Sequence, residues 1–286
     1  MTKIKNYLAL IRVHQWFKNI LILLPVITTQ KNIGSETYIN LIIIFISFSL
    51  ASSLVYVFND FFDKNEDIKH PLKKTKPIAN KSINLNEVII IFIIIFLLFL
   101  FIITQFGMKS ENTYLIFGYL FLSFIYTVLV KKIIFFDVLL VASFYVFRIK
   151  CGVNEIDEDI NNLIYLQIYT AAIFILLCKR FSDLNFSNNI YKKYFNILKK
   201  SIDFILLGNI IIYFLIINSE YLYEKYGGKP YYFTVLFVII SFLRYRHYTL
   251  KNKNTLDPVK ILFKSKVLIL SNFLWIVSIF LLNNML

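Results

Sequence analysis

Charged residues, cysteines and histidines are scarce in this chain, and each shortage excludes a class of protein. Only 17% of the 286 residues are charged, whereas 58% are hydrophobic. A soluble domain carries about 25% charged and about 45–50% apolar residues, so a water-soluble globule and a disordered chain are both excluded. The two cysteines, Cys151 and Cys178, lie in or near apolar segments, which favours small buried side chains over a disulfide framework. With three scattered histidines, a zinc site is not expected.

Long apolar runs make up most of the sequence, and they predict an all-α integral membrane protein. A helix needs about 20 mostly apolar residues to cross the hydrocarbon core, and about nine runs approach that length. They lie at residues 17–30, 38–58, 87–106, 113–129, 135–151, 162–178, 201–218, 231–247 and 266–283. No linker rich in Gly, Ser or Pro divides the chain, so we expect a single transmembrane domain over residues 1–286.

Lysine and arginine gather on one side of these predicted spans. If the N-terminus is inside, the inner segments hold 25 of the 31 Lys and Arg residues. The positive-inside rule predicts this asymmetry, so the N-terminus and the inner connections are placed at the cytoplasmic face. Orientation and contact with anionic lipid then explain the net charge of +14, and no nucleic-acid partner is required. The two long inner connections, residues 59–86 and 179–200, are where chemistry is expected.

The first inner connection begins with a stripe of oxygen-bearing side chains. The stripe consists of Asn59, Asp60, Asp63 and Asp67. Residues three and four apart share a face of a helix, so these side chains are expected along one line. Like charges near the hydrocarbon are costly, so a compensating positive charge is expected. Carboxylates of this kind hold Mg²⁺ together with substrate phosphates; the alternative is a solvated helix end neutralised by Lys64 and Lys69.

A basic loop follows the acidic stripe directly. Its basic side chains are Lys69, His70, Lys73, Lys74, Lys76 and Lys81. Pro71 and Pro77 keep this loop from continuing as one regular helix. Metal-binding carboxylates followed by a rigid cationic loop suit a substrate that carries a diphosphate.

At these residues the sequence resembles a known family. The motif N-D-x-x-D-x-x-x-D, from Asn59 to Asp67, is similar to the first signature of the UbiA superfamily of intramembrane prenyltransferases. The resemblance implies an all-helical UbiA-like bundle with a polar cavity that faces the cytoplasm. Further segments are similar to the polyprenyl-phosphate phosphoribosyltransferase branch: IRVHQWFKN (11–19), HPLKKTKPIA (70–79), IYTVLVKK (125–132), DVLLVASFYVFRIKCG (137–152), CKRFSDL (178–184), FLRY (242–245) and LDPVKILFKSK (256–266).

The resemblance also implies a reaction and its residues. The expected reaction moves 5-phosphoribose from 5-phosphoribosyl 1-diphosphate to a polyprenyl phosphate, releases diphosphate, needs Mg²⁺ and supplies precursors of cell-envelope pentose glycans. The metal ligands would be Asn59, Asp60, Asp63 and Asp67, with the three aspartates as catalytic residues. Substrate would be bound by Gln15, Lys18, Asn19, Lys69, Lys73, Lys76, Tyr126, Lys131, Arg148, Lys179 and Asp183. The protein would lie in the cytoplasmic membrane of a bacterium or archaeon, and homo-oligomerisation is left open.

The sequence leaves alternatives open for the donor substrate of the reaction and for the role of Arg148. In CKRFSDL (178–184), two cations precede a single acid, Asp183, where aromatic prenyltransferases of the superfamily carry a second acidic motif. A basic second loop better suits a donor with an additional phosphate, but an aromatic or quinone-type prenyltransferase remains the alternative. A non-enzymatic lipid transporter would explain the spans, but not the acidic stripe with its basic loop. Arg148 either binds the lipid phosphate or pairs with the acidic outer segment at 154–159.

Overall fold

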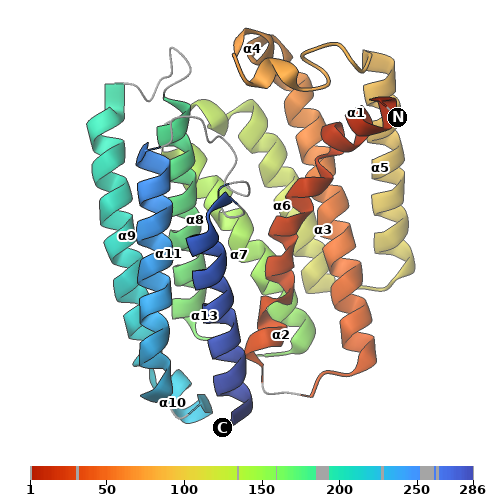
Figure 1. Ribbon diagram of the computed structural model, residues 1–286. Coiled ribbons are helices and arrows are strands. Elements are labelled where there is room, and N and C mark those ends of the chain that lie inside the picture. The colour runs from red at the N-terminus through yellow and green to blue at the C-terminus, as the bar shows by residue number, and fades with distance from the viewer. Residues whose placement is uncertain are drawn as a thin grey trace. The chain divides into compact units, whose positions relative to one another are not determined.

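The computed structural model describes residues 2–29, 32–133, 135–158, 160–184, 193–226, 229–251, 261 and 264–285. Within these ranges every regular element is a helix, which confirms the all-α prediction (Figure 1). Packing contacts divide the chain into two compact units: unit 1 is Met1–Pro25 with Ile33–Glu158, and unit 2 is Val26–Asn32 with Asp159–Leu286. The single domain over residues 1–286 stays a prediction. Most of the segment LDPVKILFKSK (256–266) lies outside the described residues.

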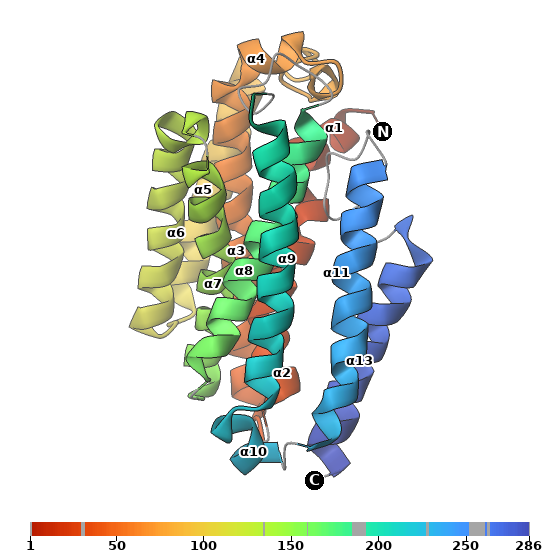
Figure 2. The ribbon, with the colours of Figure 1, turned by 90° about the vertical axis from the view of Figure 1, so that its left-hand side faces the viewer.

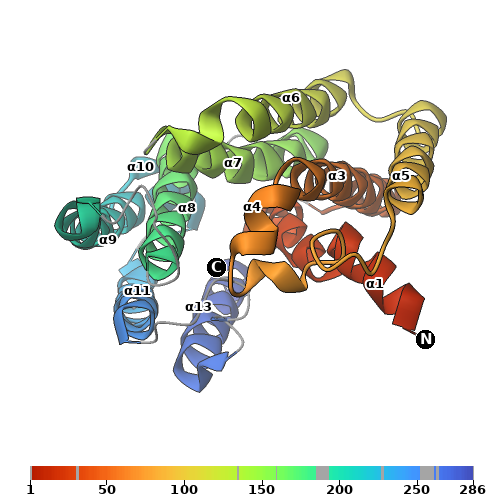
Figure 3. The same ribbon diagram turned by 90° about the horizontal axis from the view of Figure 1, so that it is seen from above.

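Unit 1 is built around one long central helix. Its elements are α1 (Thr2–Ile11), η1 (Val13–Leu23), α3 (Ser35–Phe62), α4 (Lys64–Lys69), η2 (Lys73–Thr75), α5 (Leu85–Gln105), α6 (Ser110–Val128), η3 (Val130–Lys132) and α7 (Phe136–Ile156); α2 (Leu24–Thr28) crosses the boundary between the units. Helix α3 contacts α1, η1, α5, α6 and α7 (Figures 2 and 3). In the most apolar 18-residue stretch of each helix, 61% of α3 is buried inside the protein, but only 17% of α5. Helix α3 is therefore the core of the unit, whereas α5 presents an apolar face to its surroundings.

Unit 2 is a second group of packed helices. Its elements are α8 (Asn162–Asp183), α9 (Phe195–Ile217), α10 (Glu220–Tyr226), η5 (Lys229–Phe233), α11 (Thr234–Lys251) and α13 (Lys266–Met285). Helix α8 packs on α9, α11 packs on α13, and α11 also contacts α8 and α9. Arg246 on α11 forms an ion pair with Asp203 on α9, with Nη2 2.9 Å from Oδ2. This pair ties the two helices together.

The predicted spans agree with the helices at all but the first position. Among the described residues, five helices are long and apolar enough to cross a membrane: Lys3–Ile27, Ser35–Phe62, Leu85–Gln105, Asn162–Asp183 and Phe195–Ile217. The other predicted spans coincide with α6, α7, α11 and α13. Helix α7 falls short in apolar character because Asp137, Arg148, Lys150 and Glu155 all lie on it. The chain is thus an integral membrane protein with several apolar helices.

The first predicted span, residues 17–30, is wrong at its start. Helical structure already begins at Thr2, and the segment Val13–Leu23 is a 3₁₀-helix of 11 residues rather than an α-helix. Runs of 3₁₀-helix longer than about four residues are uncommon, so tertiary contacts must hold this one. Trp16 Nε1 donates to Ser53 Oγ at 3.0 Å, and Asn19 Nδ2 donates to Ser49 Oγ at 2.9 Å. Both serines belong to α3, so two hydrogen bonds fasten η1 to the central helix.

Helix α7 also packs closely on η1. The close approach is at Gly152, where a Cβ atom would lie 2.0 Å from the carbonyl oxygen of Ile22. No side chain fits in that space without a backbone shift, so glycine is required there. The neighbouring Cys151 and the distant Cys178 are both buried free cysteines, as predicted.

Candidate active site

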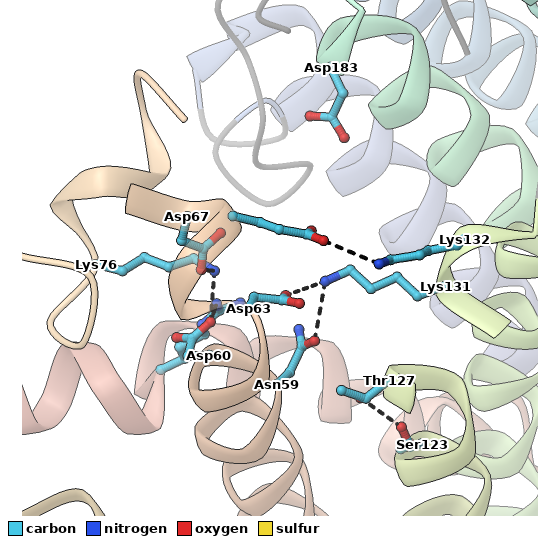
Figure 4. Close-up of polar contacts among 12 residues, drawn as sticks. Asn59, Asp60, Asp63, Asp67, Lys76, Ser123, Thr127, Lys131, Lys132 and Asp183 are labelled. Atoms are coloured by element: carbon cyan, nitrogen blue, oxygen red, sulfur yellow. Dashed lines mark hydrogen bonds and ion pairs between the residues drawn. The ribbon is translucent and has the colours of Figure 1, made fainter. Parts of the chain in front are cut away.

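The acidic stripe lies where α3 ends and α4 begins (Figure 4). Asp63 is both the C-cap of α3 and the N-cap of α4. The stripe therefore crosses the junction between two helices instead of following one helix. The helical spacing nevertheless continues, because the Asp63 amide donates to the Asn59 carbonyl at 2.9 Å and the Asp67 amide donates to the Asp63 carbonyl at 2.8 Å. Asp60 and Asp67 are buried, with exposed fractions of 2% and 3%. The predicted gathering of these side chains is therefore present.

Two cations meet the buried acids of the stripe. Lys76 Nζ bridges two carboxylates, at 2.7 Å from Asp60 Oδ1 and 2.6 Å from Asp67 Oδ2. Arg12 Nη2 lies 2.6 Å from the same oxygen of Asp60, and its guanidinium stacks 4.7 Å from the centre of the Tyr56 ring. The compensating positive charge predicted from the sequence is thus confirmed, and it comes from Arg12, 48 residues away from Asp60, and from Lys76 of the basic loop.

Lys131 contacts the other two residues of the stripe, Asn59 and Asp63. It follows α6 in the short turn η3, and its Nζ forms an ion pair with Asp63. The same nitrogen lies 3.5 Å from Asn59 Oδ1 (Figure 4). Next to it, Lys132 and Glu66 form an exposed pair at 3.4 Å. Lys131 therefore sits between two of the predicted metal ligands, as Lys76 does between the other two.

Buried apolar residues fix the position of the basic loop. Ile78 and Ile83, with exposed fractions of 2% and 3%, pack in one cluster with Leu10 of α1 and Val57 of α3. Lys76 lies two residues before Ile78, so burial of the isoleucine holds the lysine backbone near the acids. Apolar contacts in the loop thereby set the geometry of the charged site.

The sequence H-P-L-K at the start of this loop forms a tight turn. His70 Nδ1 accepts the amide hydrogens of Leu72 and Lys73, at 3.2 and 3.3 Å, and a single 3₁₀ turn follows. Pro71 and Pro77 lie on either side of that turn. The prediction that the prolines prevent one regular helix is confirmed.

Burial influences the protonation of the stripe. It raises the pKa of the Asp67 carboxyl, while the hydrogen bond and charge of Lys76 act in the opposite direction. The nearby carboxylates of Asp60 and Asp63 raise the same pKa further. The ionised form of Asp67 therefore depends on Lys76 more than an exposed carboxylate would.

The predicted N-terminal substrate residues line η1. Gln15 and Asn19 are buried, and Lys18 is half-buried and hydrogen-bonded to the Tyr56 hydroxyl. Tyr56 thus lies between Lys18 and Arg12, the cation that pairs with the acidic stripe.

Arg148 belongs to a buried polar network deeper in unit 1. It is 4% exposed, its Nε donates to Asn19 Oδ1 at 2.7 Å, and its Nη1 donates to the Phe144 carbonyl at 2.6 Å. Glu155 of the acidic outer segment instead accepts from Asn40 and Asn112. A role for Arg148 in binding the lipid phosphate stays a prediction.

The remaining predicted residues lie on α4, η2 and α6 of unit 1 and on α8 of unit 2. In unit 1, Lys69 is exposed on α4, Lys73 is half-buried in η2 and Tyr126 is half-buried near the end of α6. In unit 2, Lys179 is half-buried on α8, and Asp183 at the end of α8 is 6% exposed. Asp183 Oδ2 lies 3.5 Å from Arg180 Nη1, so the single acid of this segment is partly neutralised by its own helix.

Arg12 is a site residue that the sequence analysis did not select. It lay within the recognised segment IRVHQWFKN, but an arginine beside a membrane-spanning segment has an ordinary explanation as a flanking charge. The available signal was spacing, because Arg12, Gln15 and Lys18 recur every third residue. A three-residue spacing fits the 3₁₀-helix η1, which begins one residue after Arg12.

The oxygen atoms of the acidic stripe are of the kind that bind Mg²⁺. Among the described residues no cluster of three or more His, Cys, Asp or Glu side chains could hold a metal by itself. Two pairs of oxygen donors nevertheless converge on a lysine nitrogen: Asn59 with Asp63, and Asp60 with Asp67. Mg²⁺ is commonly held by one or two carboxylates together with substrate phosphates, so these pairs fit an ion that arrives with a diphosphate.

Comparison with known proteins identifies one family. The sequence profile of the UbiA prenyltransferase family matches residues 27–277. Among solved structures, a UbiA homolog from Archaeoglobus fulgidus bound to DMAPP and Mg²⁺ is 16% identical, with a TM-score of 0.70 over 98% of this chain and 100% of that chain. A structure of digeranylgeranylglyceryl phosphate synthase is 16% identical, with a TM-score of 0.63 over the whole of both chains. These two likenesses establish the UbiA-like fold.

Curated relatives match over shorter segments. The decaprenyl-phosphate phosphoribosyltransferase of Mycobacterium tuberculosis is 37% identical over 73 residues, which are 24% of this chain and 24% of that protein. An uncharacterized protein of Sinorhizobium fredii is 26% identical over 177 residues, 61% of this chain and 33% of that protein. The matches thus span 24% and 33% of the lengths of these relatives.

Proposed function

Because this chain belongs to the UbiA prenyltransferase family of transferases, we propose that it transfers 5-phosphoribose from 5-phosphoribosyl 1-diphosphate to a polyprenyl phosphate. The observation that favours this donor is the end of α8, where one acid, Asp183, is paired with Arg180 and preceded by Lys179. A single carboxylate is too few to build a second metal site there. Cations at that place suit the additional phosphate on the ribose, which a prenyl diphosphate does not have. The local similarity to a decaprenyl-phosphate phosphoribosyltransferase supports the same choice.

The diphosphate of the donor is assigned to the acidic stripe of unit 1. Asn59 and Asp63 are the best candidates for direct contact with Mg²⁺, and Asp60 and Asp67 assist them. The bound ion would neutralise the charge that develops on the departing diphosphate. Phosphate oxygens would be held by the lysines Lys18, Lys69, Lys73, Lys76, Lys131 and Lys179.

The chemical step exchanges one bond at the anomeric carbon of the ribose. The bond from this carbon to the diphosphate oxygen breaks, and the electron pair leaves with the diphosphate. A phosphate oxygen of the lipid attacks from the opposite face of the oxocarbenium-like carbon. The lipid phosphate is already an anion at neutral pH, so no dedicated general base is needed. The site residues therefore orient the donor and stabilise charge, and move no proton.

We place this reaction at the cytoplasmic face of a bacterial or archaeal membrane, because 25 of the 31 Lys and Arg residues lie on the side that includes the stripe. Prenyl transfer from a prenyl diphosphate to an aromatic or quinone-precursor acceptor is the second candidate. The family match and the fold shared with a UbiA homolog bound to DMAPP favour it.

The deciding experiment incubates the purified protein in lipid with Mg²⁺, labelled 5-phosphoribosyl 1-diphosphate and a polyprenyl phosphate. Label is expected in the lipid phase with Mg²⁺, and not with EDTA. Asp63→Ala is expected to lower the rate by about 10²–10³-fold, as loss of one preorganised electrostatic group does. Near-normal rates for Asp63→Ala would contradict the metal assignment. Absence of transfer, with consumption of geranyl diphosphate and an aromatic acceptor, would establish the second candidate instead.

A further inference from the structure

Positively charged side chains match the negative charges of the acidic stripe. The three aspartates of the stripe are paired with three cations: Arg12, Lys76 and Lys131. A neutral cluster has little electrostatic attraction for a divalent cation, and an ion that entered would leave the site with an excess of two positive charges. A metal ion alone is therefore a poor ligand for this site.

Two lysines also occupy the places where the metal-binding oxygens converge. The nitrogen of Lys76 lies between Asp60 and Asp67, within 2.7 Å of an oxygen of each. The nitrogen of Lys131 lies between Asp63 and Asn59 (Figure 4). Carboxylate oxygens that bind an ammonium group in this way cannot bind a metal ion at the same point. The lysines must move before the ligand pairs become available.

The three cations differ in their freedom to move. The guanidinium of Arg12 is planar and lies against the ring of Tyr56, so its position is fixed by packing as well as charge. All three side chains are similarly exposed, at 22% for Arg12, 21% for Lys76 and 25% for Lys131, so an incoming anion can reach each of them. The difference is flexibility, because the ammonium groups of Lys76 and Lys131 end flexible four-carbon chains. The two lysines, and not Arg12, are therefore the cations that can leave the stripe.

We propose that Lys76 and Lys131 are exchangeable counterions that close the stripe to divalent cations until a diphosphate arrives. The inference rests on the proposed function, because it takes a diphosphate as the incoming anion. The diphosphate oxygens draw the two ammonium groups away from the carboxylates, and the freed oxygens then become ligands for the ion that accompanies the diphosphate. Arg12 stays on Asp60 throughout. When diphosphate leaves, the lysines return to the acids and the ion loses its site.

The proposal fixes an order of binding that a preformed metal site would not show. Divalent cation alone should bind weakly, and diphosphate should strengthen its binding. Removal of one lysine charge should strengthen cation binding in the absence of diphosphate, and should reduce the strengthening that diphosphate causes.

The test measures Mn²⁺ binding to the purified full-length protein in detergent by electron paramagnetic resonance, with and without inorganic diphosphate. Lys76→Met and Lys131→Met are each expected to bind Mn²⁺ about tenfold more tightly than the wild type when diphosphate is absent. Lys74→Met and Lys132→Met are the matched controls, because both lysines are exposed neighbours of the two tested ones. The controls are expected to stay within about twofold of the wild type.

Equal Mn²⁺ affinity in the wild type, Lys76→Met and Lys131→Met would overturn the proposal. Lys76→Arg provides a second variant should Lys76→Met fail to fold, because it keeps the charge on the acids; it is expected to bind Mn²⁺ no more tightly than the wild type, and tighter binding would also overturn the proposal. The readout is independent of turnover. A shift in Mn²⁺ affinity without phosphoribosyl transfer would refute the proposed donor alone, whereas transfer without the shift would refute the lysine exchange alone.

Discussion

Unit 1 buries carboxylates at both ends of α3, and the two ends neutralise them in different ways. Where α3 ends, Asp60 is 2% exposed and contacts two cations, Arg12 and Lys76. Where α3 begins, Glu155 of α7 is 6% exposed and accepts hydrogen bonds from Asn40 Nδ2 at 2.9 Å and Asn112 Nδ2 at 3.1 Å. The first carboxylate is balanced by charge, and the second is held by neutral amides.

This difference separates an exchangeable site from a fixed one. An amide donor is part of a short side chain with a preferred partner, and it gains little by turning to a passing anion. An ammonium group makes charge-assisted hydrogen bonds with any suitable oxygen, including those of a phosphate. The end with cations can therefore accept a charged substrate, whereas the Glu155 carboxylate is held in place by two amide donors.

The largest expected effect comes from removing a charge at the end with cations. Asp60→Asn leaves Arg12 and Lys76 with one carboxylate fewer, and should lower the free energy of unfolding by about 3 kcal/mol, since loss of one partner leaves a buried charge uncompensated. Thermal unfolding in detergent, followed by circular dichroism, measures this. The double variant Asp60→Asn with Arg12→Gln restores the charge balance and should recover part of the loss. No recovery would show that the contacts of Asp60, and not its charge, stabilise this end.

A smaller effect is expected from a change that touches neither end. Gly152→Ala places a Cβ atom 2.0 Å from the Ile22 carbonyl oxygen, so α7 must move away from η1. Overpacking of this kind costs about 1–3 kcal/mol of stability, again measurable by thermal unfolding. Gly118→Ala on α6 is the matched control, because its Cβ would meet only Phe147 at an ordinary 3.8 Å. Equal unfolding temperatures for the two variants would contradict the close packing of α7 on η1.

The smallest effect is expected at the end with amides. Glu155→Gln keeps an oxygen for Asn40 and Asn112 and removes only the charge, so the loss in the free energy of unfolding should be about 1 kcal/mol. Transfer of labelled phosphoribose should stay within about twofold of the wild type, since the proposed function assigns no substrate contact to Glu155. A loss of transfer comparable to that of Asp63→Ala would mean that both ends of the unit take part in the reaction.

Helix positions were largely predictable from the sequence because hydrophobic runs report them directly. The runs at 87–106, 162–178 and 266–283 coincide with α5, α8 and α13. The prediction for the N-terminal segment was wrong for two reasons. The charges of Lys3 and Lys5 lower the hydropathy where the helix begins, and hydropathy does not distinguish a 3₁₀-helix from an α-helix. The contacts with Ser49 and Ser53 that hold η1 are tertiary, and no local pattern encodes them.

The acids of the site were predictable and their partners were not. A spacing of three and four residues indicated Asn59, Asp60, Asp63 and Asp67 without knowledge of the fold. A compensating positive charge was expected without a named source, and Lys76 and Lys131 were predicted only to bind phosphate, whereas in the structure they bridge the acids. Lys131 is 68 residues away from Asp63 in the chain, and only the packing of α6 against α3 brings them together.

The 3₁₀ geometry of η1 has a consequence for how its length can vary. With three residues per turn, Trp16, Asn19 and Ile22 form one column and Gln15 and Lys18 form the next. The first column carries the two side-chain bonds to α3, and the second carries two predicted substrate residues. Insertion of a single residue in this stretch would rotate everything beyond it by about 120° and exchange the columns. Insertion or deletion of three residues would keep them, so natural length variation in Val13–Leu23 should occur in multiples of three.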